Sequence, residues 1–459
     1  MEYKGLERHS SRFRGYTELR VQENREAVIV LANGDVLQNR GLVTGGSSAR
    51  AYKGGVWGFA SNPATDDAAI ARVVGIATSN ARFLAGKEGR GEVDLPCRPG
   101  SGSFDYSMAR PRAGQKELME FVKAIDARIA ERHKGLCARS VRLRGLDMEK
   151  TMLASDGGSG YSMTPQVMLY VEMTVEAGPD TVNVHKVFGG LGRFEDWFGE
   201  PAALFESIEE AHDHLMRKAQ GVHAEAGLHE VVLGPELAGI LAHEAIGHTV
   251  EADLVLGGSV AGENLGRKVA SEIVTLVDYA HTAKGRICPV PVHVDDEGTE
   301  ARDVVLIEDG VLRNFMHNKE TAGHFGVEPM GNARAHEFSD EPLVRMRNTA
   351  IDPGTSSLDD MISDVQDGYY LIRPSNGQAD STSEFMFGVV LGYEIKRGKI
   401  GRAIRDVTIS GVAFDMLKTV TALSKDMTWV SGMCGKKQLI PVGMGGPALR
   451  CQVMIGGRL

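Results

Sequence analysis

Residues 231–250 read VVLGPELAGILAHEAIGHTV, and the rest of the chain is organised around this stretch. The apolar run 231–242 predicts a short strand, a turn and a helix. Pro235 suits the first helical position, where a missing N–H costs nothing, and Glu236 complements the positive helix N-terminus. Helical spacing predicts a buried stripe at Leu237, Ile240, Leu241 and Ala245.

The second half of the stretch has the pattern H-E-x-x-x-H, with Glu244 beside His243 and His248 as the second histidine. In zinc hydrolases two histidines hold the metal and the glutamate takes a proton from bound water. Their usual spacing of four residues is about 40° around a helix, whereas five residues correspond to roughly 140°. Unless the two histidines are unrelated, the helix must therefore depart from regular geometry between them. Gly247 is compatible with a π-bulge or a helix end there.

A catalytic zinc site needs a third protein ligand and one position left for water. Residues of suitable type lie both near the motif and far along the chain. They are Glu251, Asp253, His281, Cys288, His293, Cys434 and Cys451. Periodicity does not choose among them. Glu251 and Asp253 could instead orient a ligand histidine, or belong to a solvated helix end.

The composition is that of an ordinary globular protein. The 459 residues are 42% hydrophobic and 24% charged, with a formal net charge of −10. This acidic balance, without a cluster of Lys and Arg, argues against nucleic-acid binding. There is no signal-like start and no apolar run of roughly 20 residues, so we expect a cytoplasmic protein that contacts no membrane. The five cysteines form neither a disulfide framework nor a CxxC motif.

The first half of the chain alternates between strand and helix patterns. Amphipathic or alanine-rich helices are predicted at 66–85, 115–132 and 200–221. Strands are predicted at 18–22, 27–31, 36–38, 141–144, 150–155 and 166–176. Asn33-Gly34-Asp35 indicates a hairpin turn. The glycine tract 189–193 reads as a plain loop, and His212 and His214 as residues of a solvated helix face.

The second half shows short strand-like segments separated by turns. They lie at 272–278, 290–294, 303–308, 389–396, 399–407 and 453–455. Only 357–367 and 414–423 look helical there. We therefore predict an α+β protein, with an N-terminal mixed α/β domain at 1–225. A β-rich C-terminal domain at 226–459 would carry the H-E-x-x-x-H helix.

Several strings follow the histidine motif in a fixed order. After HEAIGH and Glu251-Ala252-Asp253 they are DDEGT (295–299), GNAR (331–334), RMRNT (345–349), GMCGK (432–436), PVG (441–443) and PALR (447–450). In these residues the chain resembles the TldD/PmbA family of peptidases, and specifically its zinc-bearing TldD-type members. Zinc-free members lack H-E-x-x-x-H, so the resemblance implies the active type.

The resemblance also implies a site and an activity. In that family the cysteine of the Cys-Gly-Lys string is the third zinc ligand, which here is Cys434, beside His243 and His248. The expected function is a zinc-dependent peptidase that hydrolyses unfolded or extended peptides, with the zinc-bound water activated by Glu244. A thiolate ligand cancels one zinc charge, so a positioned base matters more. The site would be enclosed in a dimer, formed with a second copy or with a zinc-free paralogue.

Two other functions stay open at this point. One is a metal amidohydrolase of small substrates, and the other is a non-hydrolytic regulatory or binding subunit of a peptide-processing complex. Family members have been linked by name to DNA gyrase, but the acidic balance gives no physical support for contact with DNA. The GNAR string predicts a tight turn rather than a catalyst. The β-rich second half could leave a strand edge beside the metal, able to pair with any extended chain.

Overall fold

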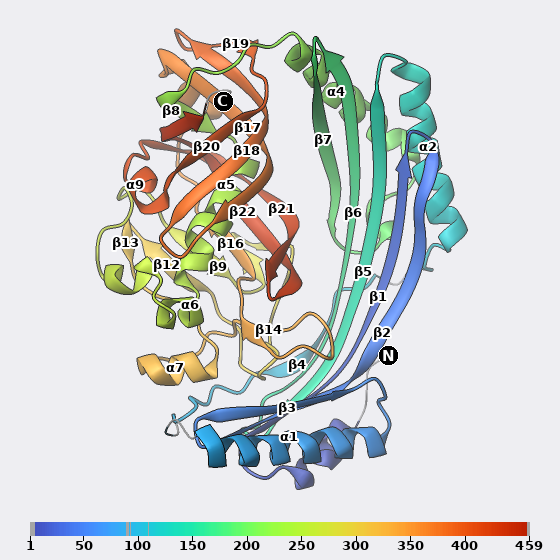
Figure 1. Cartoon of the computed structure of the whole chain (residues 1–459), viewed down its shortest axis with the longest axis vertical. Coiled ribbons are helices and arrows are strands. Elements are labelled where there is room, and N and C mark those ends of the chain that lie inside the picture. Colours follow the sequence, from blue (N-terminus) through green and yellow to red (C-terminus); the bar gives the residue numbers. More distant parts are fainter. Residues whose placement is uncertain (1–4, 89–90, 92, 109, 457–459) are drawn as a thin grey trace.

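The computed structural model describes residues 5–88, 91, 93–108 and 110–456. The fold is α+β and rich in strands, as the sequence predicts. A 7-stranded sheet contains the strands up to residue 191, and an 11-stranded sheet contains strands from residue 227 onwards. The first sheet is long and curved, and the second half of the chain packs against one of its faces (Figure 1).

The N-terminal sheet has the order β3-β2-β1-β5-β6-β4, with β7 added to β6. Only the pairing of β4 with β6 is parallel among these strands. The bounds are β1 Thr17–Ala32, β2 Asp35–Lys53, β3 Val56–Asn62, β4 Ser101–Asp105, β5 Ala138–Ala154, β6 Ser159–Ala177 and β7 Asp180–Leu191. The predicted turn at Asn33 and Gly34 joins β1 to β2, and both residues have positive φ.

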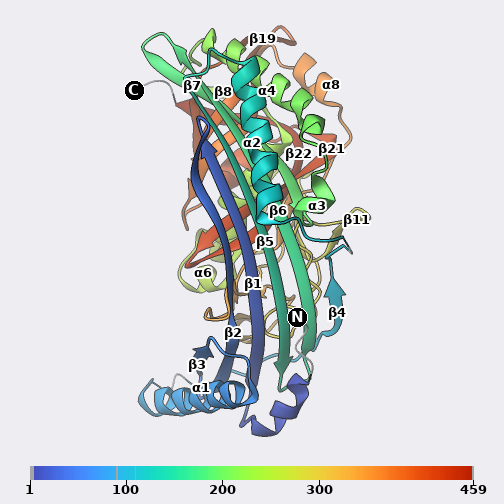
Figure 2. The same ribbon diagram turned by 90° about the vertical axis from the view of Figure 1, so that its right-hand side faces the viewer.

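Helices cover the other face of this sheet (Figure 2). They are α2 (Gln115–Arg132), which has the predicted bounds, and α4 (Phe205–Ala219), after the short turns α3 (Phe194–Trp197) and Pro201–Leu204. The apolar stripe of α2, including Val122 and Ile125, packs on Ile29 of β1 and Leu143 of β5. The helix α1 (Asp67–Glu88) packs on β2 and β3 at one end of the sheet. Among the described residues, none of the helices combines the length and the hydrophobicity that a membrane-spanning helix requires.

The C-terminal sheet has the order β13-β12-β9-β16-β22-β20-β18-β17-β8, with β19 on β18 and β21 on β22. Its long strands are β8 Gly227–Leu233, β17 Asp367–Ala379, β18 Glu384–Lys396, β20 Val407–Val412, β21 Ala422–Lys436 and β22 Gln438–Gly456. Its shorter strands are β9 Leu276–Tyr279, β12 Val304–Glu308, β13 Val311–Leu312, β16 Asn348–Ile351 and β19 Lys399–Ala403. Because β22 also pairs with β8, the strands β22, β20, β18, β17 and β8 form a closed ring within the sheet.

The remaining elements of the second half are short. The helices are α5 Pro235–Leu241, α6 Ala252–Leu256, α7 Lys319–Phe325, α8 Leu358–Ser363 and α9 Ala413–Lys418. The short hairpins are β10 Thr282–Ala283 with β11 Arg286–Ile287, and β14 Ala333–Arg334 with β15 Leu343–Val344. The apolar core of this half surrounds α5, whose Leu237 and Leu241 are buried as predicted.

The structure corrects several predictions. The predicted strands 18–22 and 27–31 are parts of the single strand β1, because pairing on both sides carries the strand through polar residues. Residues 290–294 form no regular strand and instead line a cavity against the N-terminal sheet. The glycine tract is not a plain loop, since β7 continues to Leu191. Neither helix histidine is merely solvated: His212 stacks on a histidine of the α2 end, and His214 contacts a tyrosine hydroxyl.

Candidate metal centre

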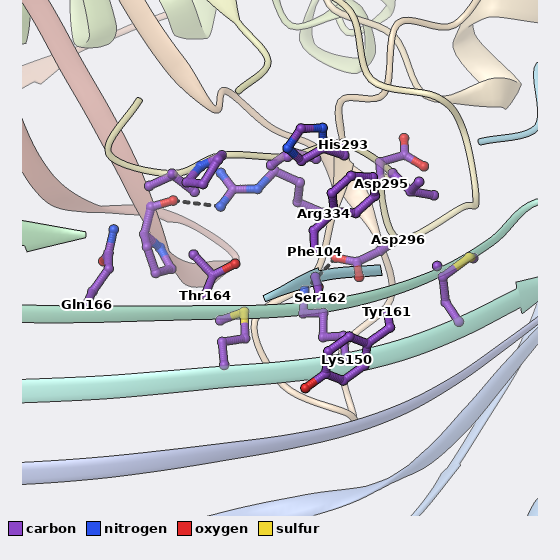
Figure 3. A pocket seen from close by; sticks show the side chains of 18 residues that line it. Phe104, Lys150, Tyr161, Ser162, Thr164, Gln166, His293, Asp295, Asp296 and Arg334 are labelled. Carbon is purple, nitrogen blue, oxygen red and sulfur yellow. Dashed lines mark hydrogen bonds and ion pairs between the residues drawn. The ribbon is translucent and has the colours of Figure 1, made fainter. Parts of the chain in front are cut away.

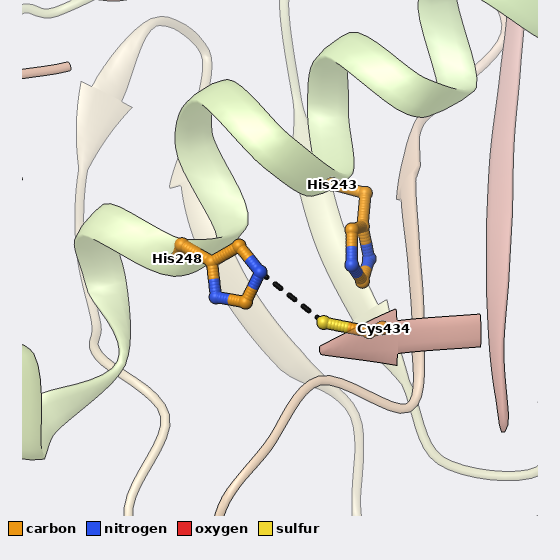
Figure 4. Close-up of side chains that lie close together, drawn as sticks. All are labelled: His243, His248 and Cys434. Carbon is orange, nitrogen blue, oxygen red and sulfur yellow. Dashed lines mark hydrogen bonds between the residues drawn. The ribbon is translucent and has the colours of Figure 1, made fainter. Parts of the chain in front are cut away.

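The two histidines of the motif lie in a π-helical turn, Ala242–Gly247, that directly follows α5. The peptide N–H of His248 donates to the carbonyl of His243, which is the i to i+5 bond of π geometry. The predicted departure from a regular helix between the two histidines is therefore confirmed. In the wider turn the two imidazoles approach the same point instead of facing apart (Figure 4).

Gly247 is required by the packing of this turn. A Cβ atom on Gly247 would lie 2.0 Å from the Sδ atom of Met346, which is a fully buried residue. Any other residue would push the turn away from the core or displace Met346. The glycine thus serves close packing, and its φ is that of a right-handed helix.

A third side chain reaches the histidines from β21. The Sγ atom of Cys434 lies 3.2 Å from Nε2 of His248, and the two imidazole rings are 5.4 Å apart at 78°. One ligand atom from each of His243, His248 and Cys434 lies within 4.8 Å of the others. Two nitrogens and one sulfur so arranged are the donor types that zinc prefers.

The hydrogen bonding of His243 tests whether a metal fits here. This residue is fully buried, and neither ring nitrogen has a hydrogen-bond partner among the described residues. Buried polar atoms are seldom left unpaired, so the ring nitrogens indicate a missing partner. Burial, with the charges of His248 and Arg345, holds the pKa of His243 well below its usual range. The ring is therefore neutral, which is the form that binds a metal.

His248 is oriented from its other side. Its Nδ1–H donates to Oε2 of the buried Glu251 at 2.8 Å, and Lys436 lies 3.2 Å from the same oxygen. Burial alone would lower the pKa of His248, but Glu251 and the contact with Cys434 raise it to about 10. A metal that binds at Nε2 must displace the proton on that nitrogen, whereas the Nδ1–H keeps its hydrogen bond to Glu251. The structure therefore supports the prediction that Glu251 orients a candidate ligand histidine, rather than belonging to a solvated helix end. Asp253 contacts Lys436 and not a histidine.

Glu244 lies at the open side of the histidine pair. About a quarter of its side chain is exposed, and its Oε2 is 3.7 Å from Nε2 of His248. Burial raises the pKa of Glu244, although His248 partly offsets this effect. A half-buried carboxylate beside two candidate ligands, with access to solvent, is placed to exchange a proton with a water molecule.

Residues 226–457 match the family described as the PmbA/TldA metallopeptidase C-terminal domain. Residues 17–81 match its domain 1. The chain belongs to the PmbA/TldD family. It is 32% identical over 454 residues to a metalloprotease of Methanothermobacter thermautotrophicus, covering 96% of this chain and 95% of that protein. These matches and names support a metallopeptidase.

Two further proteins place this PmbA/TldD chain among its relatives. A zinc metalloprotease TldD homolog of Saccharolobus solfataricus is 32% identical, over 63% of this chain and 64% of that protein. The crystal structure of TldE from Thermococcus kodakarensis superposes with a TM-score of 0.74 at 17% identity, covering 97% of this chain and 98% of that one. At this identity the second similarity shows the fold alone.

Arg345 is a residue of the site that the sequence did not indicate. Its guanidinium is fully buried and donates to the carbonyl of Cys434 at 2.7 Å, and to the carbonyls of Gln438 at 3.0 Å and Lys436 at 3.2 Å. It therefore fixes the turn between β21 and β22, and with it the cysteine. Arg345 belongs to the RMRNT string, but a string alone does not reveal which distant carbonyls an arginine binds.

The other possible third ligands lie elsewhere. His293 stacks between Phe104 and His281, with ring centroids 3.9 Å and 4.2 Å away. It lines a cavity between β6 and residues 290–296 that Arg334 also enters (Figure 3). In the register of β21 with β22, Cys434 pairs with Ile440. Pro441, which lines this cavity, pairs with Met433 instead. Because side chains alternate along a strand, the cavity is on the opposite face of the hairpin from the thiol.

The predicted turn at GNAR is present, since Gly331 has a φ of 79°. Asn332 and Arg334 then bind backbone and carboxylate groups of the core. The Asn332 amide donates to Asp278 at 2.8 Å, and the Arg334 guanidinium donates to the carbonyl of Met346 at 2.6 Å. The Arg334 contact holds Met346, the residue that packs on Gly247, so the string supports the π-helical turn through this methionine.

Proposed function

We propose that this protein is a zinc-dependent peptidase that hydrolyses unfolded or extended peptides. The observation that carries the proposal is the convergence of His243, His248 and Cys434 beside the partly exposed Glu244. These residues come from two elements far apart in the sequence. The unpaired ring nitrogens of His243 further support a metal as the missing partner.

In this proposal the metal ligands are His243, His248 and Cys434. A zinc ion held there would supply Lewis acidity, polarising the scissile carbonyl and lowering the pKa of water. The thiolate of Cys434 would offset one of its two charges, so the proton of the attacking water needs a good acceptor.

Glu244 is the proposed general base. It follows the first candidate ligand and is not itself in the ligand set, so its carboxylate is available for proton transfer. The raised pKa of Glu244 suits this task, because a base works best when its pKa approaches the working pH. The same carboxyl can then return the proton to the leaving amine.

The substrate class is inferred from the strand that carries Cys434. Among the described residues, β21 forms ladder pairs with β22 alone, so the other edge of 427–433 is left without a partner strand. Met427, Trp429 and Val430 are half-buried on this stretch, and Thr428 is exposed. An extended peptide could pair with this edge through its backbone, with little demand on its side chains.

We also propose that the chain works as a dimer, with a second copy or with a zinc-free paralogue. Among the residues that the structure describes, β1 is the one strand that pairs with 35–46 of β2, and this stretch exposes apolar side chains. Leu37 is 68% exposed and Val43 is 60% exposed. Unpaired apolar strand edges are usually covered in the working assembly. Sedimentation of the pure chain distinguishes the cases, since a monomer that dimerises only on mixing with a paralogue indicates the heterodimer.

The test is metal analysis together with digestion of a casein-type unfolded substrate. We expect about one zinc per chain, cleavage that a chelator abolishes, and a Glu244→Ala variant that keeps zinc without cleaving. Zinc binding with cleavage of small amides but not of peptides would indicate an amidohydrolase instead. Zinc binding without hydrolysis of either substrate would indicate a regulatory subunit.

A further inference from the structure

The ammonium group of Lys436 lies between two carboxylates, only one of which touches the candidate metal centre. Its Nζ is 3.2 Å from Oε2 of Glu251, and it donates to Oδ1 of Asp253 at 2.7 Å. A third bond runs to the carbonyl of Val344 at 3.0 Å. The side chain of Lys436 is largely buried, whereas that of Asp253 is one-third exposed.

Glu251 depends on this lysine for its position. The carboxylate is fully buried, and its Oε2 faces both Nδ1 of His248 and Nζ of Lys436. Its Oε1 has no hydrogen-bond partner among the described residues. The orientation of this carboxylate is therefore set by two hydrogen-bond donors, the Nδ1–H of His248 and the ammonium group of Lys436. Removing one partner of such a buried pair leaves the other charge poorly compensated.

Lys436 also comes from the same strand as the candidate cysteine ligand. Residues two apart on a strand point to the same face, so Cys434 and Lys436 leave β21 together. One reaches Nε2 of His248 through its thiol, and the other reaches Nδ1 of the same ring through Glu251. Arg345 binds the carbonyls of both residues, which holds the pair in register.

We propose that Lys436 is a positioning residue of the metal centre. It holds Glu251 against Nδ1 of His248, so that Nε2 stays directed towards the thiol of Cys434 and the metal between them. Carboxylates behind ligand histidines commonly contribute 10–100-fold to metal affinity. The inference rests on the proposed function, because it assigns Lys436 a role only if the three residues bind a metal.

The experiment measures zinc affinity by competition with a chromophoric chelator. Lys436→Met is expected to weaken zinc binding about 10-fold, and Glu251→Gln by about 10–100-fold. Asp253→Asn is the matched control, since Asp253 binds the same ammonium without touching His248. Lys425→Met removes an exposed lysine from the same strand. Both controls are expected to stay within threefold of the wild type.

The direction in which Lys436→Met changes zinc affinity distinguishes a positioning role of the lysine from a purely electrostatic one. Removing a nearby cation would, through charge alone, strengthen the binding of Zn²⁺, so weaker binding requires loss of orientation. The double variant Lys436→Met/Glu251→Gln is expected to bind no more weakly than Glu251→Gln, because the lysine acts through the carboxylate. Unchanged or tighter binding in Lys436→Met, or additive losses in the double variant, would overturn the proposal.

A second variant covers the case in which Lys436→Met does not fold. Lys436→Arg keeps the positive charge but replaces a compact ammonium by a planar fork, and is also expected to weaken zinc binding. Wild-type affinity in this folded variant would reject the proposal. If the wild type itself binds no zinc in a His243-dependent way, the proposed function fails. If only the Lys436 variants behave like the wild type, the positioning role alone fails.

Discussion

The sulfur of Met346 occupies the place where a side chain on Gly247 would begin, 2.0 Å from the position of its Cβ. Gly247 is the last residue of the π-helical turn, and Met346 lies between Arg345 and Arg347, both fully buried. The packing of the core and the geometry of the histidine pair are therefore linked through this one contact.

Gly247→Ala is expected to destabilise the protein by about 1–3 kcal/mol, because the added methyl group overpacks a rigid core. It should also weaken metal binding, since the turn must move. Thermal unfolding and zinc affinity are the measurements. Gly75→Ala is the control: apart from its own helix, the methyl group would meet no described atom within 4 Å. Gly75 lies in the interior of α1, where alanine should stabilise by roughly 0.5–1 kcal/mol. Equal effects of the two changes would contradict the packing argument.

Cys434→Ser is expected to remove most of the bound zinc, because a serine hydroxyl is a poor substitute for a thiolate at a zinc site. Cys451→Ala is the control, as Cys451 is also buried on the paired strand but does not belong to the group that Cys434 forms with the histidines. Zinc is counted per chain after dialysis against a weak chelator. An unchanged zinc content in Cys434→Ser would reject Cys434 as the third ligand.

Glu244→Gln is expected to keep zinc content and stability while lowering kcat by about 10²–10⁴-fold, the usual effect of removing a general base. Glutamine has nearly the same shape, so peptide binding should change little. The measurement is the initial rate of peptide cleavage at saturating substrate. A rate within tenfold of the wild type would assign proton transfer to another group.

The free energy of unfolding is expected to fall as the pH falls from about 6.5 towards about 4. Burial lowers the pKa of His317 to about 4, and burial with the charge of Lys150 does the same for His336. Both rings are neutral in the folded state, so their contribution is complete above the unfolded-state pKa of about 6.5. It decreases as the pH falls and is lost below about pH 4. His317→Gln should reduce the difference in Tm between pH 7 and pH 5, relative to the exposed-site control His324→Gln.

Unfolded chains should be cut and folded proteins spared. A folded substrate has already used its backbone N–H and C=O groups, so it cannot pair with the free edge of β21. The test compares a stable globular protein with a destabilised mutant of the same protein at equal concentration. Equal cleavage rates for the two would show that the site does not select for disorder.

The sequence predicted some parts of this structure because the signal is local. The apolar period of α2 gave its bounds to the residue, and the five-residue spacing of His243 and His248 required an irregular helix. The bounds of the strands were harder to predict. β1 passes through polar residues, and it stays a single strand there because it pairs with β2 on one side and β5 on the other. The candidate ligands could be predicted in part, because the sequence shows which residue types bind metals. The residues that hold those ligands in position could not be predicted. Whether Glu251 orients a histidine depends on Lys436, and no local pattern links those positions.

The separation of the candidate ligands along the chain has a consequence for how the protein is made. His248 and Cys434 are 186 positions apart, and the cysteine is held in place only once β22 has been added beside β21. A ribosome therefore exposes the histidine turn long before the thiol that completes the set. Domains begin to fold while synthesis continues. If the proposed function is correct, the growing chain passes through a stage in which it is partly folded but has no peptidase activity. Other unfinished chains nearby, which are unfolded peptides themselves, are thereby protected from a peptidase that is still being made.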